Sequence, residues 1–99
     1  MATYDVFRNP GGAGYLLDVQ ADVLEGLSTR VVVPLLPMDS APLPAKRLNP
    51  VFDLAEVPHV MVTQFLSAVS ASLLKAPVAN LGARQAEVTL ALDMLTHGF

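Results

Sequence analysis

The run 30–36 is the feature of this chain that most limits its fold. It contains three successive valines and then Pro34. Valines favour the extended state because their side chains are already restricted at χ1. The continuous apolar character predicts a strand that is covered on both faces. Pro34 has no N–H to donate to a neighbouring strand, so we expect it at a strand end, an edge or a bulge.

Short apolar segments and turn signals surround this run, and together they predict five to seven strands. Residues 3–8 and 15–20 are expected to form a hairpin around the turn signal at 9–12. Residues 21–29 form a connector, in which Val23 and Leu24 are either exposed or held against the core. Further strands are expected at 51–54, 59–63 and within 65–74, and a short strand or a turn at 45–47. A proline-rich loop covers 37–44, and a turn lies at 55–56.

The last part of the chain changes period and predicts one helix over 84–94. Helix-forming residues dominate there, and the segment contains neither Gly nor Pro. One face carries the apolar residues Val88, Ala91, Leu92 and Leu95, and another carries Leu90 and Met94. A helix that is apolar on two sides has two neighbours, here a sheet and a dimer mate. We expect Gly82 at the N-cap and Gly98 at the C-terminal stop. The fold class is therefore mostly β (α+β): a small antiparallel barrel or sandwich with one C-terminal helix.

Composition limits the classes of function. The 99 residues predict one domain, 1–99, and 53% hydrophobic against 15% charged residues leave too little polar surface to cover it. We therefore expect a homodimer, in which a second copy of the chain covers the exposed apolar surface. The net charge of −3, with scattered bases, argues against nucleic-acid binding. The absence of cysteine fits a cytoplasmic protein without disulfides. We expect no signal peptide, and residues 60–74 are too short and too polar to span a membrane.

No arrangement of polar residues indicates an enzyme, a metal site or a cofactor. His59 and His97 are far apart in sequence, and a metal needs three or four convergent ligands. We expect His59 on a strand surface, and Asp18 and Asp22 as solvated surface acids. The glycines at 11–14 precede a strand and not a helix, so they predict a hairpin tip and not a phosphate loop.

The chain ends in an apolar residue that has no evident place in its own core. His97, Gly98 and Phe99 follow the expected helix, and chain termini are usually surface features. The segments 18–22, 30–35, 48–51 and 95–99, at their spacing, resemble the CcdB family, the toxins of bacterial toxin–antitoxin modules. The resemblance runs nearly end to end. Asp18-Val19-Gln20-Ala21-Asp22, followed by a β run that ends in Pro-Leu, is its most specific part.

The resemblance implies an SH3-like antiparallel barrel with one C-terminal helix, forming a homodimer. It also implies a toxin that is not an enzyme. Such a toxin inserts its C-terminal end into the GyrA dimer of DNA gyrase and traps the cleaved DNA complex, and a cognate antitoxin neutralises it by folding onto the toxin dimer. Carried over position by position, the gyrase-binding surface would comprise His97, Gly98, Phe99, Thr96, Asp93, Val23 and Leu24.

This chain departs from the family pattern at two of these positions. The best-known toxins of the family have Trp where this chain has His97, and Thr96 also stands in place of an aromatic residue. Histidine buries less area, and it loses its attraction to a cation when protonated. Two alternatives therefore stay open. One is a ribonuclease toxin of the related MazF or PemK type, using Arg30, Arg84 and an aspartate. The other is a toxin-derived homologue that is no longer toxic.

Overall fold

A computed structural model describes residues 2–98, and its first element is a hairpin. Strands β1 (Asp5–Arg8) and β2 (Tyr15–Asp18) pair antiparallel, with Val6 opposite Leu17. Asn9 ties the loop between them, because its side chain accepts a hydrogen bond from the Gly11 N–H at 2.9 Å. Gly14 has a φ of +86°, and a Cβ there would lie 2.3 Å from the Leu35 carbonyl oxygen. Only glycine permits this close approach of the loop to the next strand. The expected hairpin is confirmed.

Strand β3 (Thr29–Pro37) is the centre of the sheet. One of its edges pairs with β2, and the other pairs first with β6 (Ser67–Ser70) and then with β5 (Val57–Met61). Pro34 lies inside this strand, and its carbonyl accepts a hydrogen bond from the Val62 N–H at 2.9 Å. Its missing N–H faces the gap between the last β6 pair, at Val32, and the first β5 pair, at Leu35. A proline is tolerated there because no ladder partner is lost.

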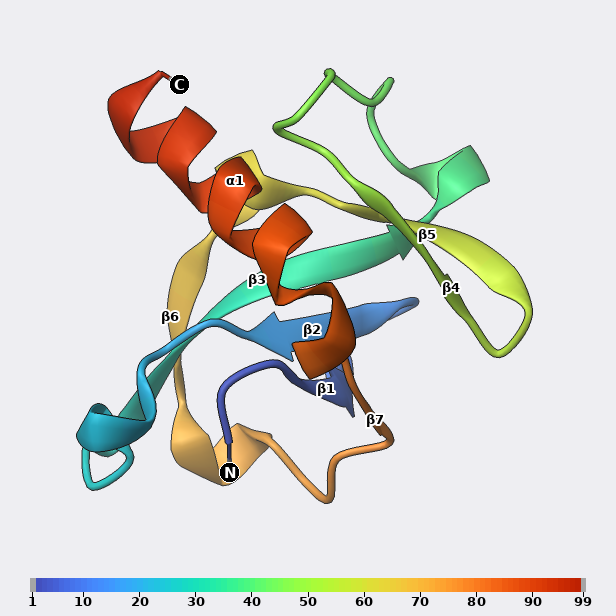
Figure 1. The fold of residues 1–99 in the computed structure, drawn as a ribbon. Coiled ribbons are helices and arrows are strands. Elements are labelled where there is room, and N and C mark those ends of the chain that lie inside the picture. The colour runs from blue at the N-terminus through green and yellow to red at the C-terminus, as the bar shows by residue number, and fades with distance from the viewer. Residues whose placement is uncertain (1, 99) are drawn as a thin grey trace.

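The sheet has seven strands in the described residues and curls into a half-barrel (Figure 1). Its path is β4-β5-β3-β2-β1-β7, and β6 joins β3 beside that path. Strand β4 (Val51–Leu54) meets β5 through a tight turn in which Ala55 and Glu56 both have positive φ. Strand β7 (Ala79–Asn80) pairs with β1. This architecture confirms the mostly β, SH3-like fold class with five to seven strands.

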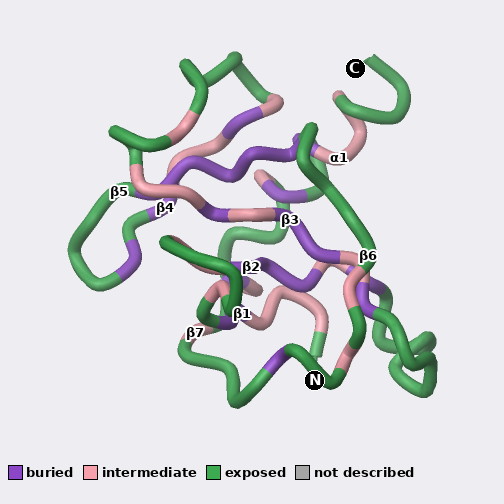
Figure 2. Tube along the Cα trace, turned by 180° about the vertical axis from the view of Figure 1, so that it is seen from behind, coloured by how far each residue is buried: buried purple, intermediate pink, exposed green. Residues whose placement is uncertain are grey.

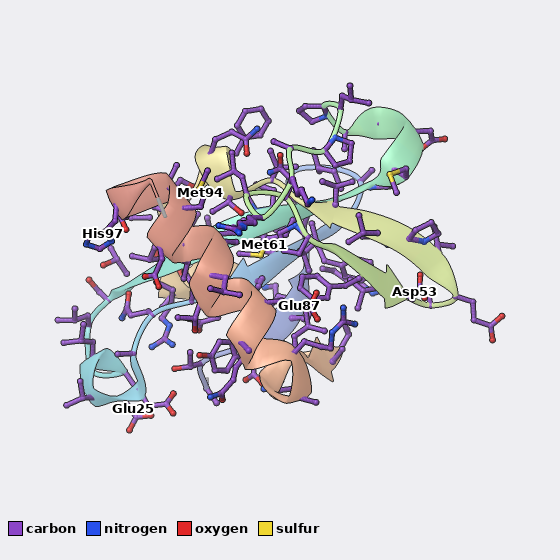
Figure 3. The ribbon with its side chains drawn as sticks, turned by 45° about the horizontal axis from the view of Figure 1, so that its top comes forward. Glu25, Asp53, Met61, Glu87, Met94 and His97 are labelled. Carbon is purple, nitrogen blue, oxygen red and sulfur yellow. The ribbon has the colours of Figure 1, made fainter. Side chains whose placement is uncertain are left out.

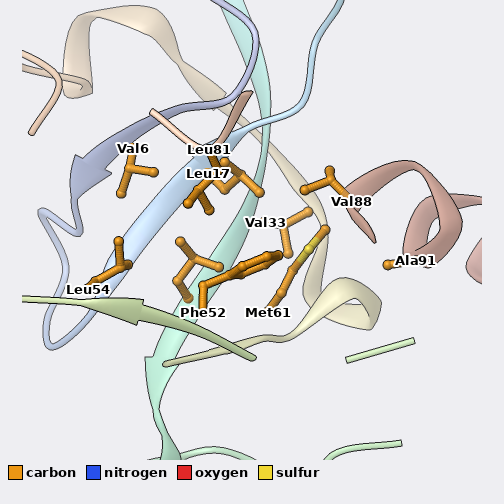
Figure 4. Packing of buried hydrophobic residues seen from close by; sticks show 10 residues of the cluster. Val6, Leu17, Val33, Phe52, Leu54, Met61, Leu81, Val88 and Ala91 are labelled. Atoms are coloured by element: carbon orange, nitrogen blue, oxygen red, sulfur yellow. The ribbon is translucent and has the colours of Figure 1, made fainter. Parts of the chain in front are cut away.

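Helix α1 (Gln85–His97) lies across one face of the sheet, above β2 and β3 (Figure 1). Val88 and Ala91 are fully buried beneath it, in the main core together with Val33, Phe52 and other apolar residues (Figure 4). A second, smaller cluster on the opposite face contains Val32 and Phe7. The two faces of β3 are therefore both covered, as the valine run predicted (Figure 2).

Several boundaries differ from the sequence-based expectation: the strands expected at 3–8, 15–20 and 59–63 cover 5–8, 15–18 and 57–61, and the helix expected at 84–94 covers 85–97. The strand expected within 65–74 and the turn that was one of two options at 45–47 are confirmed. The segment 65–74 holds one strand, β6, between two short 3-10 helices, η3 (Thr63–Phe65) and η4 (Ala71–Leu73). Residues 46–48 form a turn, and the loop after β3 begins with η2 (Met38–Ser40). Gly82 is not the N-cap of α1, because it begins η5 (Gly82–Arg84) and Arg84 occupies the cap position. Gly98 does end the helix. Within residues 2–98, no helix combines the length and the apolar character needed to cross a membrane.

Candidate functional site

The end of α1 is held by the packing of the first half of the helix. Val88 and Ala91 anchor it in the main core, and the Arg84 guanidinium lies 4.8 Å above the centre of the Phe52 ring. Arg84 also makes two hydrogen bonds to the Glu87 carboxylate, the longer at 2.9 Å. This pairing lowers the pKa of Glu87. The first turns are therefore fixed, while the last turn extends past the sheet (Figure 1).

The last turn of α1 exposes polar groups, and hydrogen bonds within the turn hold them in place. Thr96, His97 and Gly98 are exposed, and Asp93 one turn earlier is half-buried. The Thr96 hydroxyl donates to the Leu92 carbonyl at 2.9 Å and lies 2.8 Å from His97 Nδ1. Since this hydroxyl proton is engaged, the geometry fits a protonated Nδ1 that donates to the Thr96 oxygen. The pair orients the imidazole at the helix tip (Figure 3).

Gly98 caps the helix in the left-handed conformation. Its φ is +80°, and its N–H donates to the Met94 carbonyl at 3.1 Å. This is the usual glycine stop of a helix, in which an otherwise unpaired carbonyl is satisfied. Chain neighbours aside, a Cβ at this position would meet no atom of the described residues within 4 Å. Phe99, the last residue of the expected surface, lies outside the described residues.

Apolar side chains of α1 remain exposed where the sheet does not cover them. Leu90, on the second side of the helix, is 56% exposed, and Leu95, on the side of Val88 but in the last turn, is 39% exposed. Phe65 and Leu66, at the end of η3, are also exposed, and η3 packs against α1 near Met94 (Figure 3). The sequence predicted two apolar sides for this helix. The structure buries the side of Val88 and leaves that of Leu90 exposed.

Val23 and Leu24 lie on the 3-10 helix η1 (Asp22–Leu24) and are both exposed, Val23 at 87%. This short element is held by side chains from elsewhere. The Asp22 carboxylate accepts hydrogen bonds from the N–H and the hydroxyl of Thr3, at 2.7 and 2.8 Å. These two bonds lower the pKa of Asp22. Gln20 donates from its amide nitrogen to the Leu24 carbonyl at 3.0 Å and accepts from the Val31 N–H at 3.0 Å.

A buried ion pair lies beneath this segment. Asp18 on β2 and Arg30 on β3 are both buried, and the Asp18 Oδ2 atom lies 2.8 Å from Arg30 Nε and 2.5 Å from Nη2. The other carboxylate oxygen accepts from the Gln20 N–H at 3.0 Å. Burial raises the pKa of the Asp18 carboxyl, and the bonds from Gln20 and Arg30 oppose that rise. The expectation that Asp18 is a solvated surface acid is therefore wrong, whereas Asp22 is exposed as expected.

The structure does not bring the two parts of the expected surface together in one copy of the chain. Figure 1 shows η1 and the end of α1 well apart, and in Figure 3 Glu25, which follows η1, is separate from His97. The expected position of Val23 and Leu24 beside the helix tip is corrected accordingly. The reason is that Thr3 and Gln20 tie η1 to the end of β1–β2, while α1 runs away from it toward η3.

Sequence reasoning missed the role of the Asp-Val-Gln-x-Asp block. Asp18, Gln20 and Asp22 do not form a surface patch, because each stabilises the segment that exposes Val23 and Leu24. The spacing of these residues along the chain carries no signal of that arrangement.

The expectation that His59 lies on a strand surface is also wrong, because the residue is buried. It is 5% exposed, and its ring meets Tyr15 edge-on at 5.1 Å between centroids. Strand β5 carries it two residues before the buried Met61, and residues two apart in a strand share a face. Its burial is therefore set by the sheet and not by any local pattern.

The residues considered for a ribonuclease are engaged in structural pairs. Arg30 is buried against Asp18, and Arg84 pairs with Glu87. Among the described residues, no three His, Cys, Asp or Glu side chains gather as a metal would require.

These observations define a class of protein: a small half-barrel of SH3-like type that exposes the capped end of a single helix. A comparison with protein families finds a match to the family described as CcdB protein, over residues 3–98. The chain therefore belongs to the CcdB family. A search of curated proteins finds no match to it. Membership in this family supports the role of a toxin in a toxin–antitoxin system, for which an antitoxin and DNA gyrase are the general partners.

Proposed function

We propose that this toxin acts by binding the GyrA dimer of DNA gyrase through the end of α1, without an enzymatic step. The exposed, capped tip of the helix is the observation that carries the proposal. Gly98 leaves open space beside the backbone, and the Thr96 hydroxyl orients the His97 ring. A planar ring and a bare backbone at one tip can enter a narrow junction between two subunits. Phe99, which follows the described residues, would add one apolar side chain to this tip.

We propose that the working form is a homodimer. The exposed apolar side chains Leu90, Leu95, Phe65 and Leu66 support a self-association surface along α1 and η3. A chain with 15% charged residues has little polar surface with which to replace them. Analytical ultracentrifugation should give twice the chain mass. Leu90→Asp should shift the protein to the monomer, whereas the exposed Leu43→Asp, 93% exposed in a loop, should not.

The gyrase proposal is tested with purified protein and with cells. Wild-type protein should stabilise cleaved DNA in a gyrase cleavage assay, and its expression should arrest growth. Removal of Gly98 and Phe99 should abolish both effects while the circular dichroism of the fold is unchanged. His97→Ala should weaken them about tenfold, because one ring at the centre of a contact contributes about 1–2 kcal/mol.

Thr89→Ala is the matched control for Thr96→Ala, because both threonines are exposed on the same helix and only Thr96 contacts His97. The Thr96 variant should lose activity and the Thr89 variant should retain it. Normal growth under strong expression of the wild type, with no cleaved DNA in the gyrase assay, would contradict the proposal. In that case the non-toxic homologue would be the better description of the chain.

A cognate antitoxin is proposed as the second partner. The apolar side chains that α1 and η1 leave exposed offer contacts for a segment that folds on binding. Co-expression with the gene adjacent to this one should restore growth in cells that the wild-type toxin arrests.

A further inference from the structure

The half-barrel has a pocket at its open end, on the side of the molecule away from the tip of α1. The loop 9–14, the β4–β5 turn and the strands beside them enclose about 400 Å³. Figure 3 shows the end of the β4–β5 hairpin, marked by Asp53, on the opposite side from His97. A volume of this order is in the range of small-molecule sites, which commonly form in the mouths of β-barrels.

The polar groups of the pocket favour an anion. Arg8, Tyr15 and His59 line it, and no Asp or Glu does. Among residues 2–98, Arg8 makes no ion pair. A guanidinium without a counter-ion at the mouth of a concave site is the group that most often binds phosphate or carboxylate.

His59 adds a polar atom that is fixed and available. The residue is 5% exposed, and its Nδ1–H donates to the Val57 carbonyl at 2.8 Å. The Tyr15 ring meets it edge-on and holds its plane. Because Nδ1 is engaged, Nε2 is the nitrogen left for a ligand, and it has no hydrogen-bond partner among the described residues. It can accept from a ligand hydroxyl, or donate when the ring is protonated.

An apolar extension adjoins this polar site. A second cavity of about 250 Å³ shares Arg8, Tyr15, Leu54 and Ala55 with the first, and it is closed by Val78 and Ala79 beside β7. The shared residues place the two cavities side by side, with Arg8 where they meet. The imidazole of His59 lines only the first cavity, and the apolar Val78 and Ala79 line only the second. This division matches a ligand with a charged group at one end and a ring at the other.

We propose that this groove, formed by the two cavities, binds a phosphomonoester carried on a small ring, of the nucleoside monophosphate class. The phosphate lies against Arg8, a hydroxyl of the ligand donates to His59 Nε2, and the ring lies between Leu54 and Val78. Gly14 is required for this shape, since a side chain there would collide with the Leu35 carbonyl and push the loop off the sheet. The site is separate from the proposed gyrase surface and does not depend on it.

The test uses the full chain labelled with ¹⁵N and three probes: adenosine 5′-monophosphate, inorganic phosphate and adenosine. The amides of 12–15, Val57 and His59 should shift with the monophosphate, which should bind about tenfold more tightly than either probe alone, because both ends of the groove are used. Arg8→Ala should weaken the binding of both the monophosphate and phosphate about tenfold or more, which is the expected effect of losing one charged hydrogen-bond partner. Val78→Ser should weaken the binding of the monophosphate and leave the affinity for phosphate unchanged.

Lys75→Ala is the matched control, because it removes one exposed cation outside the groove. Its affinity for the monophosphate should change less than about twofold, since a distant surface charge is largely screened. Unchanged spectra of the variants away from the groove show that they fold. The proposal is overturned if 10 mM monophosphate, about ten times the roughly 1 mM dissociation constant of a weak site, shifts no amide of 12–15. It is also overturned if Lys75→Ala weakens binding as much as Arg8→Ala, or if phosphate and the monophosphate bind equally.

Discussion

The end of α1 and the segment η1 both expose residues on the surface, yet they are held in different ways. The helix tip is fixed by contacts between close neighbours in the sequence: Thr96 with Leu92, and Gly98 with Met94. The η1 segment is fixed by contacts across 11 to 19 residues, from Thr3 to Asp22 and from Gln20 to Val31. A change at the tip therefore stays local, whereas a change beneath η1 reaches the sheet.

The difference separates exposed residues of the proposed contact surfaces from residues that the fold requires. At the tip, one residue belongs to both groups, since Gly98 ends the helix and is itself exposed. At η1, Val23 and Leu24 are exposed, and the buried Asp18–Arg30 pair beneath them meets no solvent. Single substitutions can test this separation, from the largest effect on the free energy of unfolding to the smallest.

Asp18→Ala should have the largest effect. It leaves the buried Arg30 guanidinium without its carboxylate, and Arg30 Nη1 already lacks a hydrogen-bond partner among the described residues. Breaking a buried pair in this way costs about 3–5 kcal/mol. Urea unfolding followed by circular dichroism measures the loss.

Asp93→Ala is the control for this variant, because Asp93 is half-buried on α1 and makes no ion pair with described residues. Its free energy of unfolding should change by less than about 0.5 kcal/mol. The double variant Asp18→Leu with Arg30→Met should recover much of the loss, since it removes both charges. A loss below about 1 kcal/mol in Asp18→Ala would mean that the pair is more hydrated than its burial indicates.

Gln20→Ala should have the next largest effect. Its side chain bonds the Val31 N–H and the Leu24 carbonyl, so the variant leaves a backbone donor of β3 without a partner. The cost of such a group is about 1–3 kcal/mol. Hydrogen exchange should show the Val31 amide opening, together with those of η1, while the amides of α1 keep their protection. Equal loss of protection along α1 would contradict the proposed independence of the two regions.

Much of the fold could be predicted from the sequence because its signals are local. The valine run indicated β3, the glycines after Pro10 indicated the first hairpin, and the apolar spacing after Arg84 indicated the helix with its stop at Gly98. The segment 65–74 was less determined, because its serines and alanines suit a strand, a helix or a turn. There the pairing of β6 with β3 decides the outcome.

The candidate site was predictable in part, because only some of its features depend on local sequence signals. The exposed helix tip follows from its place after a periodic segment. The burial of Asp18 does not, because its partner Arg30 is 12 residues away and the two meet only once β2 and β3 pair in register. His59 is similar, since its burial depends on Tyr15 of another strand. Charged and polar residues that bond over long distances in sequence look like surface residues until the register is known.

Gly98→Ala should have a smaller, local effect. Alanine in the left-handed conformation costs about 1 kcal/mol, but no more distant residue of the described chain lies within 4 Å of a Cβ at this position, so the last turn can fray instead. The global free energy of unfolding should change by less than that amount. Amide exchange should quicken at 94–98 and stay unchanged at Val88. A loss of protection at Val88 would show that the tip and the core are coupled.

Asp22→Asn should have the smallest effect, and it is visible in the dependence of stability on pH. The bonds from Thr3 lower the pKa of Asp22 below the unfolded value of about 3.9. A lowered pKa means that the stabilisation is present above the unfolded value and is lost as the pH falls through the folded value. Wild type should therefore be more stable than Asp22→Asn at pH 7, and the two should converge as the pH falls below the folded pKa of Asp22.

The control for this last measurement is Asp39→Asn, an exposed acid in η2 whose side chain contacts only the hydroxyl of the adjacent Ser40 among the described residues. Its unfolding curve should follow that of wild type across the same pH range. Because the Thr3–Asp22 contact ties η1 to the chain start, exchange at Leu24 should also follow the titration, quickening as the carboxylate is protonated. If exchange of the Leu24 amide is insensitive to pH while global stability falls, the Thr3–Asp22 contact stabilises β1 and not η1. The long-range hydrogen bonds that fix η1 would then come from Gln20 alone.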